Sequence, residues 1–265
     1  KENDIGVNSR AVDLHKLPVE VYARTTNGQD HLSGNINFFH SYDCCARQYW
    51  HKRPLCRHED AIVIIGFGNY GRCILERAIL TNIVSVTQHV AYHIFGDSKE
   101  FLAMHRHLHE MFSLDEVSET CDSLIFHDGF WEDCHTILES ADRIIICTDD
   151  VPEGWNIFWR LNRYYKIHGH IDLHSNRKAP GVSYFGTDEE IYTPNQIMRT
   201  TLNKAAVTIN DIFRKSVSYP TLSWEELDDF HRESKIAAAD HILMKVRILL
   251  DDETITEFTS KTIEN

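Results

Sequence analysis

The sequence has little positive charge for its size. Its 265 residues hold 27 lysines and arginines against 40 aspartates and glutamates, which gives a formal net charge of −13 at pH 7. A surface that binds nucleic acid needs lysine and arginine side chains gathered opposite the phosphates. The composition therefore excludes nucleic acid from the expected partners.

Long apolar runs and a cysteine framework are also missing. No run approaches the roughly 20 apolar residues of a membrane helix, and no signal peptide is visible. The 7 cysteines are odd in number and show no C-x-x-C spacing, which argues against a disulfide scaffold. We therefore expect a cytoplasmic chain with free thiols. Because the sequence begins at Lys1 rather than Met, we also expect it to be a piece of a longer protein.

Familiar catalytic motifs are absent as well, since the sequence has no nucleophile elbow, no Walker lysine and no pair of catalytic carboxylates. The 17 histidines invite a metal interpretation. However, His105, His107 and His109 are spaced by two, and residues two apart point to different faces of a helix. Only His105 and His109 would share a helical face, and no third ligand is evident. We predict neither a metal site nor a catalytic site.

The sequence does contain an alternation of short apolar strands with helical segments. Strands are predicted at 19–24, 61–66, 89–95, 123–127, 143–148, 170–174 and 182–186, and helices at 36–52, 70–81, 98–110, 132–140 and 152–166. This alternation predicts an α/β fold, a doubly wound parallel-sheet Rossmann-like domain. Residues 195–216 and 223–250 look helical throughout and predict a C-terminal helical unit.

The segment AIVIIGFGNYGR, residues 61–72, places the spacing G-x-G-x-x-G between a buried strand and a helix. In this fingerprint Gly66 allows the tight turn, Gly68 lets the backbone approach a pyrophosphate, and Gly71 lets the helix pack close to the sheet. The free N–H groups of the helix N-terminus favour phosphate. The predicted nucleotide-binding loop comprises Gly66, Phe67, Gly68, Asn69, Tyr70, Gly71 and Arg72. The alternative is a turn whose glycines serve packing only.

Acidic residues follow two other predicted strands of this domain. Asp97 follows the second strand, where the fingerprint places a ribose-binding acid, and it is equally a candidate N-cap for the next helix. An acid here favours an unphosphorylated ribose, so the predicted cofactor is NAD(H) or an adenine nucleotide rather than NADP. Thr148, Asp149 and Asp150 close the fourth strand at the same edge of the sheet. Asp149 or Asp150 is also a candidate cap before Pro152.

Over residues 58–186 this pattern resembles the N-terminal subdomain of regulator-of-potassium-conductance domains, the RCK or TrkA-N family. The matching residues are Gly66, Gly68, Gly71, Asp97, Asp128, Leu138, Ala141, Asp142, Thr148, Asp149 and Asp150. The resemblance implies that Asp97, Asp128, Thr148 and Asp149 join the glycine loop in binding the nucleotide. The sequence departs from the family in its long first crossover and in the HDG at 127–129, where the family usually has Gly-Asp.

Residues 222–249, LSWEELDDFHRESKIAAADHILMKVRIL, are similar to the short bacterial RyR repeat, which is named for the ryanodine receptor. The matching residues are Trp224, Leu227, Arg232, Ser234, Ala237–Ala239, His241 and Lys245. The family usually has Asn-Arg after the serine, where this sequence has Lys235 and Ile236. The alternative is an amphipathic helix that only fills core. Chains that combine both parts resemble cytosolic regions of membrane cation-transport proteins.

Four parts are therefore predicted. They are the tail of a preceding α/β module with a linker helix (1–57), a Rossmann-like RCK/TrkA-N domain (58–190), a linking and dimerisation helix (191–218) and an RyR-like helical unit (219–265). The expected function is nucleotide sensing, without catalysis, by a cytoplasmic regulatory module of a potassium or other cation transport protein at the inner face of the membrane. The expected partners are a second copy of the chain, or a higher oligomer, and a membrane transport protein or attached membrane segment. The alternatives are an NAD(P)-dependent oxidoreductase and a Rossmann scaffold that binds no nucleotide.

Overall fold

The computed structural model describes residues 21–25, 32–33, 36–83, 87–114, 116–197, 203–219 and 221–250. Predictions that fall on 1–20, 198–202 and 251–265 lie outside the described residues.

A six-stranded sheet, parallel throughout, forms the centre of the molecule, with the order β6-β5-β4-β7-β8-β9. Its strands are β4 (Ala61–Ile65), β5 (Ala91–Phe95), β6 (Ser123–His127), β7 (Arg143–Ile146), β8 (His170–His174) and β9 (Ser183–Phe185). The chain builds outward from β4 in one direction and from β7 in the other, which is the doubly wound order of dinucleotide-binding folds. The predicted α/β, Rossmann-like fold class is confirmed.

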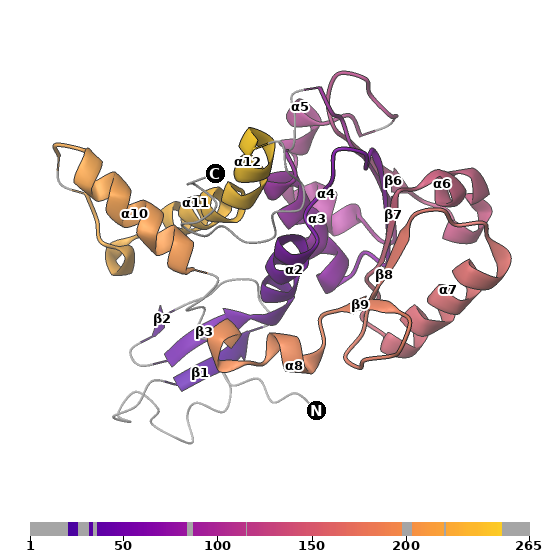
Figure 1. Ribbon diagram of the computed structural model, residues 1–265, viewed down its shortest axis with the longest axis horizontal. Coiled ribbons are helices and arrows are strands. Elements are labelled where there is room, and N and C mark those ends of the chain that lie inside the picture. Colours follow the sequence, from indigo (N-terminus) through magenta and orange to yellow (C-terminus); the bar gives the residue numbers. More distant parts are fainter. Residues whose placement is uncertain are drawn as a thin grey trace.

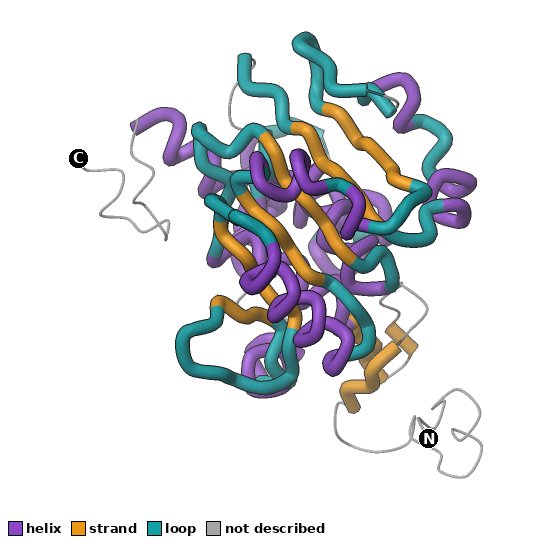
Figure 2. The backbone as a smooth tube through the Cα atoms, turned by 90° about the vertical axis from the view of Figure 1, so that its right-hand side faces the viewer, coloured by secondary structure: helices purple, strands orange, loops and turns teal. Residues whose placement is uncertain are grey.

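Helices cover both faces of this sheet, as Figures 1 and 2 show. One face packs against α2 (Ser41–Lys52), α3 (Asn69–Thr81), α4 (Lys99–Met104) and α5 (Leu108–Met111), and the other against η2 (Trp131–Asp133), α6 (His135–Ser140) and α7 (Val151–Tyr164). Successive residues of β4 alternate between the two cores, with Ile62 and Ile64 in the first and Val63 and Ile65 in the second. Burial on both faces explains why this strand is an unbroken apolar run.

The single helix predicted at 36–52 is wrong at its start. Ile36–His40 forms strand β3, which pairs in parallel with β1 (Val21–Thr25) and antiparallel with β2 (Leu32–Ser33). Helix α2 begins only at Ser41. β3 forms because it pairs with β1 and β2, which lie earlier in the chain. The apolar pattern within residues 36–40 alone does not predict this pairing.

Helix α2 shares the core of the central sheet. Its Tyr49 is buried and donates a hydrogen bond from Oη to Oδ2 of Asp172 in β8 at 2.8 Å. Just after the helix, Glu59 accepts two hydrogen bonds from Arg143 of β7, at 2.7 and 2.6 Å. These buried polar groups are paired, as burial requires. The helix expected to link two modules is thus fastened to the sheet, while the boundary at residue 57 stays a prediction.

The helix predicted at 98–110 is interrupted. α4 ends at Met104 and α5 begins at Leu108. Between them His105 turns back, with Nδ1 2.9 Å from the carbonyl oxygen of Phe101 and its ring stacked on that phenylalanine. His105 and His109 therefore do not share a helical face. Over the described ranges, no three His, Cys, Asp or Glu side chains are grouped so that they could hold a metal ion.

The C-terminal part is helical, as expected, but it is built from short elements. They are α8 (Asp188–Ile191), α9 (Pro194–Ile197), α10 (Lys204–Ser216), η3 (Trp224–Glu226), α11 (Asp229–Asp240) and α12 (Ile242–Leu250). We call α10 to α12 the C-terminal unit; it lies beside α2 and α3 (Figure 1). Its own core is small, with Ala206, Ile236 and Ala239 buried and Ile209 and Trp224 packed against them. Nowhere in the described part of the chain is a helix both long and apolar enough to span a bilayer.

Candidate functional site

The glycine loop leaves β4 at the carboxyl edge of the sheet. Gly66 has a φ of +93°, and a Cβ there would lie 2.8 Å from the backbone nitrogen of Thr148. A Cβ at Gly71 would overlap the carbonyl oxygen of Gly66. The first and third glycines are therefore required by the backbone itself, one for the turn and one for close packing of α3.

Gly68 faces a side chain instead of backbone. A Cβ at Gly68 would lie 2.5 Å from Oδ2 of Asp149. The same carboxylate oxygen lies 3.3 Å from the backbone nitrogen and 3.3 Å from Nδ2 of Asn69. Because Gly68 is the N-cap of α3, the Asn69 N–H is one of the donors that an α-helix leaves open at its N-terminus. An acidic group thus lies at the place where the fingerprint puts a phosphate.

The surroundings of Gly68 and Asn69 determine whether a diphosphate can bind at this loop. The helix N-terminus accepts an anion there, and Gly68 presents no side chain that would fill the space. Asp149 is exposed and follows the buried Thr148, so its carboxylate can move away without disturbing the core. The residues present therefore fit a phosphate group.

Arg72, in the first turn of α3, carries the positive charge of the loop. Its Nη1 donates to Oε2 of Glu100 in α4 at 2.7 Å. The Glu100 side chain is 70% exposed and that of Arg72 is 25% exposed. The sequence singled out Arg72 through the fingerprint but missed Glu100, because an acid in the first turn of a helix is common for reasons unrelated to a ligand.

Two side chains of the predicted loop face the interior. Phe67 is buried and meets Phe101 edge to face, with ring centroids 5.1 Å apart. The ring of Tyr70 lies against that of His174, with ring centroids 3.6 Å apart, and it meets Tyr42 edge to face, with centroids 4.7 Å apart. These aromatic side chains hold the loop on the domain, so a ligand would meet their backbone rather than their rings.

His174 is a buried group that sequence analysis did not single out. It ends β8, and its Nδ1 lies 3.3 Å from the carbonyl oxygen of Thr148. Since a carbonyl only accepts, the ring proton is assigned to Nδ1; Nε2 is buried and has no hydrogen-bond partner among the described atoms. Burial lowers the pKa of His174, so the imidazole is neutral at pH 7. The sequence could have indicated His174 only by its position at the end of a predicted strand. With 17 histidines in the chain, this position alone did not distinguish it from the others.

The other predicted residues lie along the same edge. Oδ1 of Asp97 accepts a hydrogen bond from the backbone N–H of Lys99 at 3.2 Å, but the N-cap residue of α4 is Ser98, so the alternative prediction of Asp97 as the N-cap is wrong. Thr148 donates from Oγ1 to the carbonyl oxygen of Asp150 at 2.9 Å and orders the turn before α7. Asp128 is exposed after the edge strand β6, and β5 separates it from the glycine loop.

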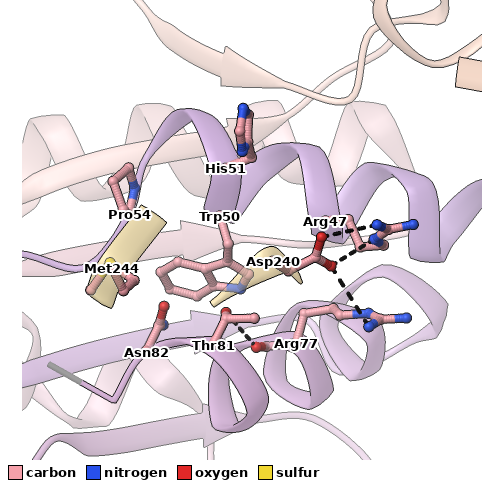
Figure 3. A pocket seen from close by; sticks show the side chains of 9 residues that line it. All are labelled: Arg47, Trp50, His51, Pro54, Arg77, Thr81, Asn82, Asp240 and Met244. Carbon is pink, nitrogen blue, oxygen red and sulfur yellow. Dashed lines mark hydrogen bonds and ion pairs between the residues drawn. The ribbon is translucent and has the colours of Figure 1, made fainter. Parts of the chain in front are cut away.

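A cavity of about 20 Å³ lies at the opposite end of α3 from the glycine loop (Figure 3). It has room for about one water molecule, so it is no nucleotide pocket. There Asp240 of α11 accepts hydrogen bonds from Arg47 of α2 at 2.7 and 2.9 Å, and Nη1 of Arg77 of α3 lies 3.9 Å from the same carboxylate. Arg77 also donates to Glu233 of α11 at 3.0 Å. These ion pairs join the C-terminal unit to α2 and α3.

Several residues of the RyR-like motif serve the structure of this unit. The guanidinium of Arg232 lies 5.7 Å from the ring centroid of Trp224, and it donates to the carbonyl oxygen of Leu227 at 2.9 Å. Nε2 of His241 lies 3.1 Å from the carbonyl oxygen of Ile83, which follows α3. Arg232 and His241, two of the matching residues of this motif, thus contact other parts of the same chain.

Comparisons with known proteins do not assign a function to the chain. Neither a family model nor a curated protein matches the chain. A crystal structure of shikimate dehydrogenase from Thermotoga maritima is similar to it, with a TM-score of 0.31 and 9% sequence identity over 83% of this chain and 72% of that chain. A similarity at this level carries no functional argument.

Proposed function

We propose that the domain binds an adenine nucleotide or NAD(H) at its glycine loop and acts as a nucleotide-sensing regulatory module. The observation that carries this proposal is the carboxylate of Asp149 at the N-terminus of α3, beside Gly68. It indicates that the loop accepts an anion at the position where the fingerprint expects a phosphate.

The residues of the loop have distinct roles in this proposal. The backbone N–H groups at Gly68 and Asn69 would bind the diphosphate, and Arg72 would contribute a positive charge from the same helical turn. Asp97 would accept a hydrogen bond from the ribose. The nucleotide supplies the negative charge that the helix N-terminus stabilises.

A second candidate is the NAD(P)-dependent oxidoreductase, which the strand order favours because dinucleotide-binding dehydrogenases share it. Hydride transfer to a carbonyl or from an alcohol needs an acid or base facing the nicotinamide. The neutral imidazole at this edge, His174, is covered by Tyr70 and points its free Nε2 into the interior. We therefore favour sensing over catalysis.

The finer part of the proposal rests on the sequence resemblances. Similarity to RCK/TrkA-N domains and to the RyR repeat supports a cytoplasmic regulatory role in a potassium or other cation transport protein, with a second copy of the chain as partner. In α10, Ala206 faces the small core of the C-terminal unit while Ile212 and Phe213 are exposed, which leaves an outer face for such a partner.

The test is a melting-temperature series with NADH, NAD, ATP and ADP, accompanied by the absorbance of NADH. A ligand at 100 times its dissociation constant adds about 2.7 kcal/mol to the free energy of unfolding, which raises the melting temperature by about 5 to 10 °C. We expect such a rise without consumption of NADH.

Gly68→Asp should abolish this rise. Its φ of −81° suits any residue, and the group that its Cβ would meet is the end of the Asp149 side chain, so the variant should fold. Gly129→Asp introduces the same charge where a Cβ meets nothing within 4 Å, and it should keep the rise. Equal rises in wild type and Gly68→Asp would place the ligand elsewhere. If no nucleotide raises the melting temperature, the result favours a Rossmann scaffold that binds no nucleotide and whose glycines serve packing only. If NADH is consumed in the presence of a substrate, the protein is an oxidoreductase.

A further inference from the structure

We infer that two of the chain's own carboxylates, Asp149 and Glu100, occupy the positions that the phosphates of the ligand take, and that the ligand must displace both. The inference rests on the proposed function and deepens it. It identifies the ligand class as a nucleotide with at least two anionic groups, and it makes the two carboxylates internal competitors that set its affinity.

The first position is the N-terminus of α3. The carboxylate of Asp149 lies 3.3 Å from two nitrogen donors of Asn69, which is longer than the usual 2.9 to 3.0 Å of such hydrogen bonds. The helix N-terminus carries only about half a positive charge, so it cannot hold a carboxylate and a phosphate side by side. A phosphate has more negative charge and more acceptor oxygens, and it therefore replaces the carboxylate rather than joining it.

The second position is the guanidinium of Arg72. Glu100 accepts a hydrogen bond from it at 2.7 Å, yet its side chain is 70% exposed. Exposed ion pairs of this kind contribute little to stability, so a phosphate that binds the guanidinium through two oxygens can exchange with Glu100 at small cost. The Arg72 side chain is only 25% exposed, so its methylene groups pack against the protein. The guanidinium therefore cannot turn away from the loop without losing this packing.

The two positions are spaced for one ligand. Asn69 and Arg72 are three residues apart in α3, so they lie on the same side of the helix within one turn, about 4.5 Å apart along its axis. This separation suits the two phosphates of a diphosphate. A nucleoside has no group for either position, and a monophosphate reaches only one.

The experiment measures the dissociation constants of ADP and adenosine by calorimetric titration of the full chain. The variants are Asp149→Asn, Glu100→Gln and the double variant, each of which keeps the side-chain shape. Removing one competing charge should tighten ADP binding about tenfold, and removing both should tighten it further, while adenosine binding stays unchanged.

Two controls separate competition from a general change in charge. Asp150→Asn and Glu110→Gln each remove one negative charge from exposed side chains for which the structure shows no contact with the loop. They should change ADP binding less than twofold. If the test variants bind ADP no more tightly than these controls do, the internal competition is refuted while the nucleotide site stands. If the wild type and every variant fail to bind ADP, ATP and NAD, the proposed function itself fails. Binding by the double variant alone would support both.

Discussion

Asp240→Asn is the sharpest test of how the C-terminal unit is held. The carboxylate of Asp240 accepts two hydrogen bonds from Arg47, whose side chain is 0% exposed, while Asp240 itself is 20% exposed. The substitution keeps the shape of the side chain but removes the charge that faces a buried guanidinium. Breaking a buried ion pair costs about 3 to 5 kcal/mol. Arg47 also donates to Oδ1 of Asn203 at 2.8 Å and keeps this partner in the variant, so we expect a cost below that range, about 2 to 3 kcal/mol.

This cost should appear in the docking of α10 and α11 rather than in the whole fold. The core of the C-terminal unit is too small to keep these helices closed, whereas the sheet has two large cores of its own. Native-state hydrogen exchange measures each region separately. A loss of 2 to 3 kcal/mol makes local opening about 30- to 150-fold more frequent, so the amides of α11 should exchange faster by that factor. Amides of β4 and β7 should keep their rates.

Asp229→Asn is the matched control, because Asp229 lies in the same helix but pairs with Arg232 at 3.4 Å from a 57% exposed side chain. Such a surface pair is worth under about 1 kcal/mol. Equal exchange rates in Asp240→Asn and Asp229→Asn would refute the view that Arg47 and Asp240 hold the unit. Faster exchange throughout the sheet would show that the unit and the Rossmann domain open together.

Three further predictions concern the turn, the pH dependence and the assembly. Gly66→Ala should lower the free energy of unfolding by more than Gly181→Ala in urea titrations, because both glycines have positive φ (+93° and +75°) but only a Cβ at Gly66 meets backbone, at 2.8 Å; equal losses would contradict this reasoning. Burial, with a smaller contribution from a neighbouring imidazole, lowers the pKa of His93 from 6.5 to about 4. The unfolded chain therefore binds more protons between these values, so stability should fall as the pH drops through this window, and it should fall less in His93→Phe. Light scattering should show a dimer that Ile212→Lys with Phe213→Lys weakens, and a strict monomer at high concentration would refute this assembly.

The sequence predicted those parts of the fold that local patterns determine. β6 and β8 have the predicted bounds, and β4 followed by α3 differs from prediction by one residue at each junction. β4 and the start of α3 were predictable because their signals, an apolar run and a glycine spacing, lie in contiguous residues. Strand β3 escaped prediction because its partner β1 begins fifteen residues earlier, at Val21 against Ile36.

The geometry of the glycine loop was predictable to the same extent, while its role in binding a nucleotide stays a prediction. The fingerprint identifies Gly66 and Gly71, whose roles are set by backbone geometry within the loop itself. The position of Asp149 beside Asn69 depends on β7 lying next to β4, and the pair of Arg72 with Glu100 depends on how α4 packs. No spacing within one segment encodes either contact, since each joins elements that the chain brings together only after folding.

The small core of the C-terminal unit limits how evolution can exchange it. The apolar cluster of Ala206, Ile236 and Ala239, with Ile209 and Trp224 packed against it, is small, so the described part of the unit lacks the apolar interior that an independent module needs. Its recipient must present arginines on two helices, as Arg47 and Arg77 do here. Gene fusion can therefore move the unit only together with the segment from α2 to α3. We expect α2, α3 and the C-terminal unit to have been inherited as one block, and deletions that cut between them to yield aggregating chains.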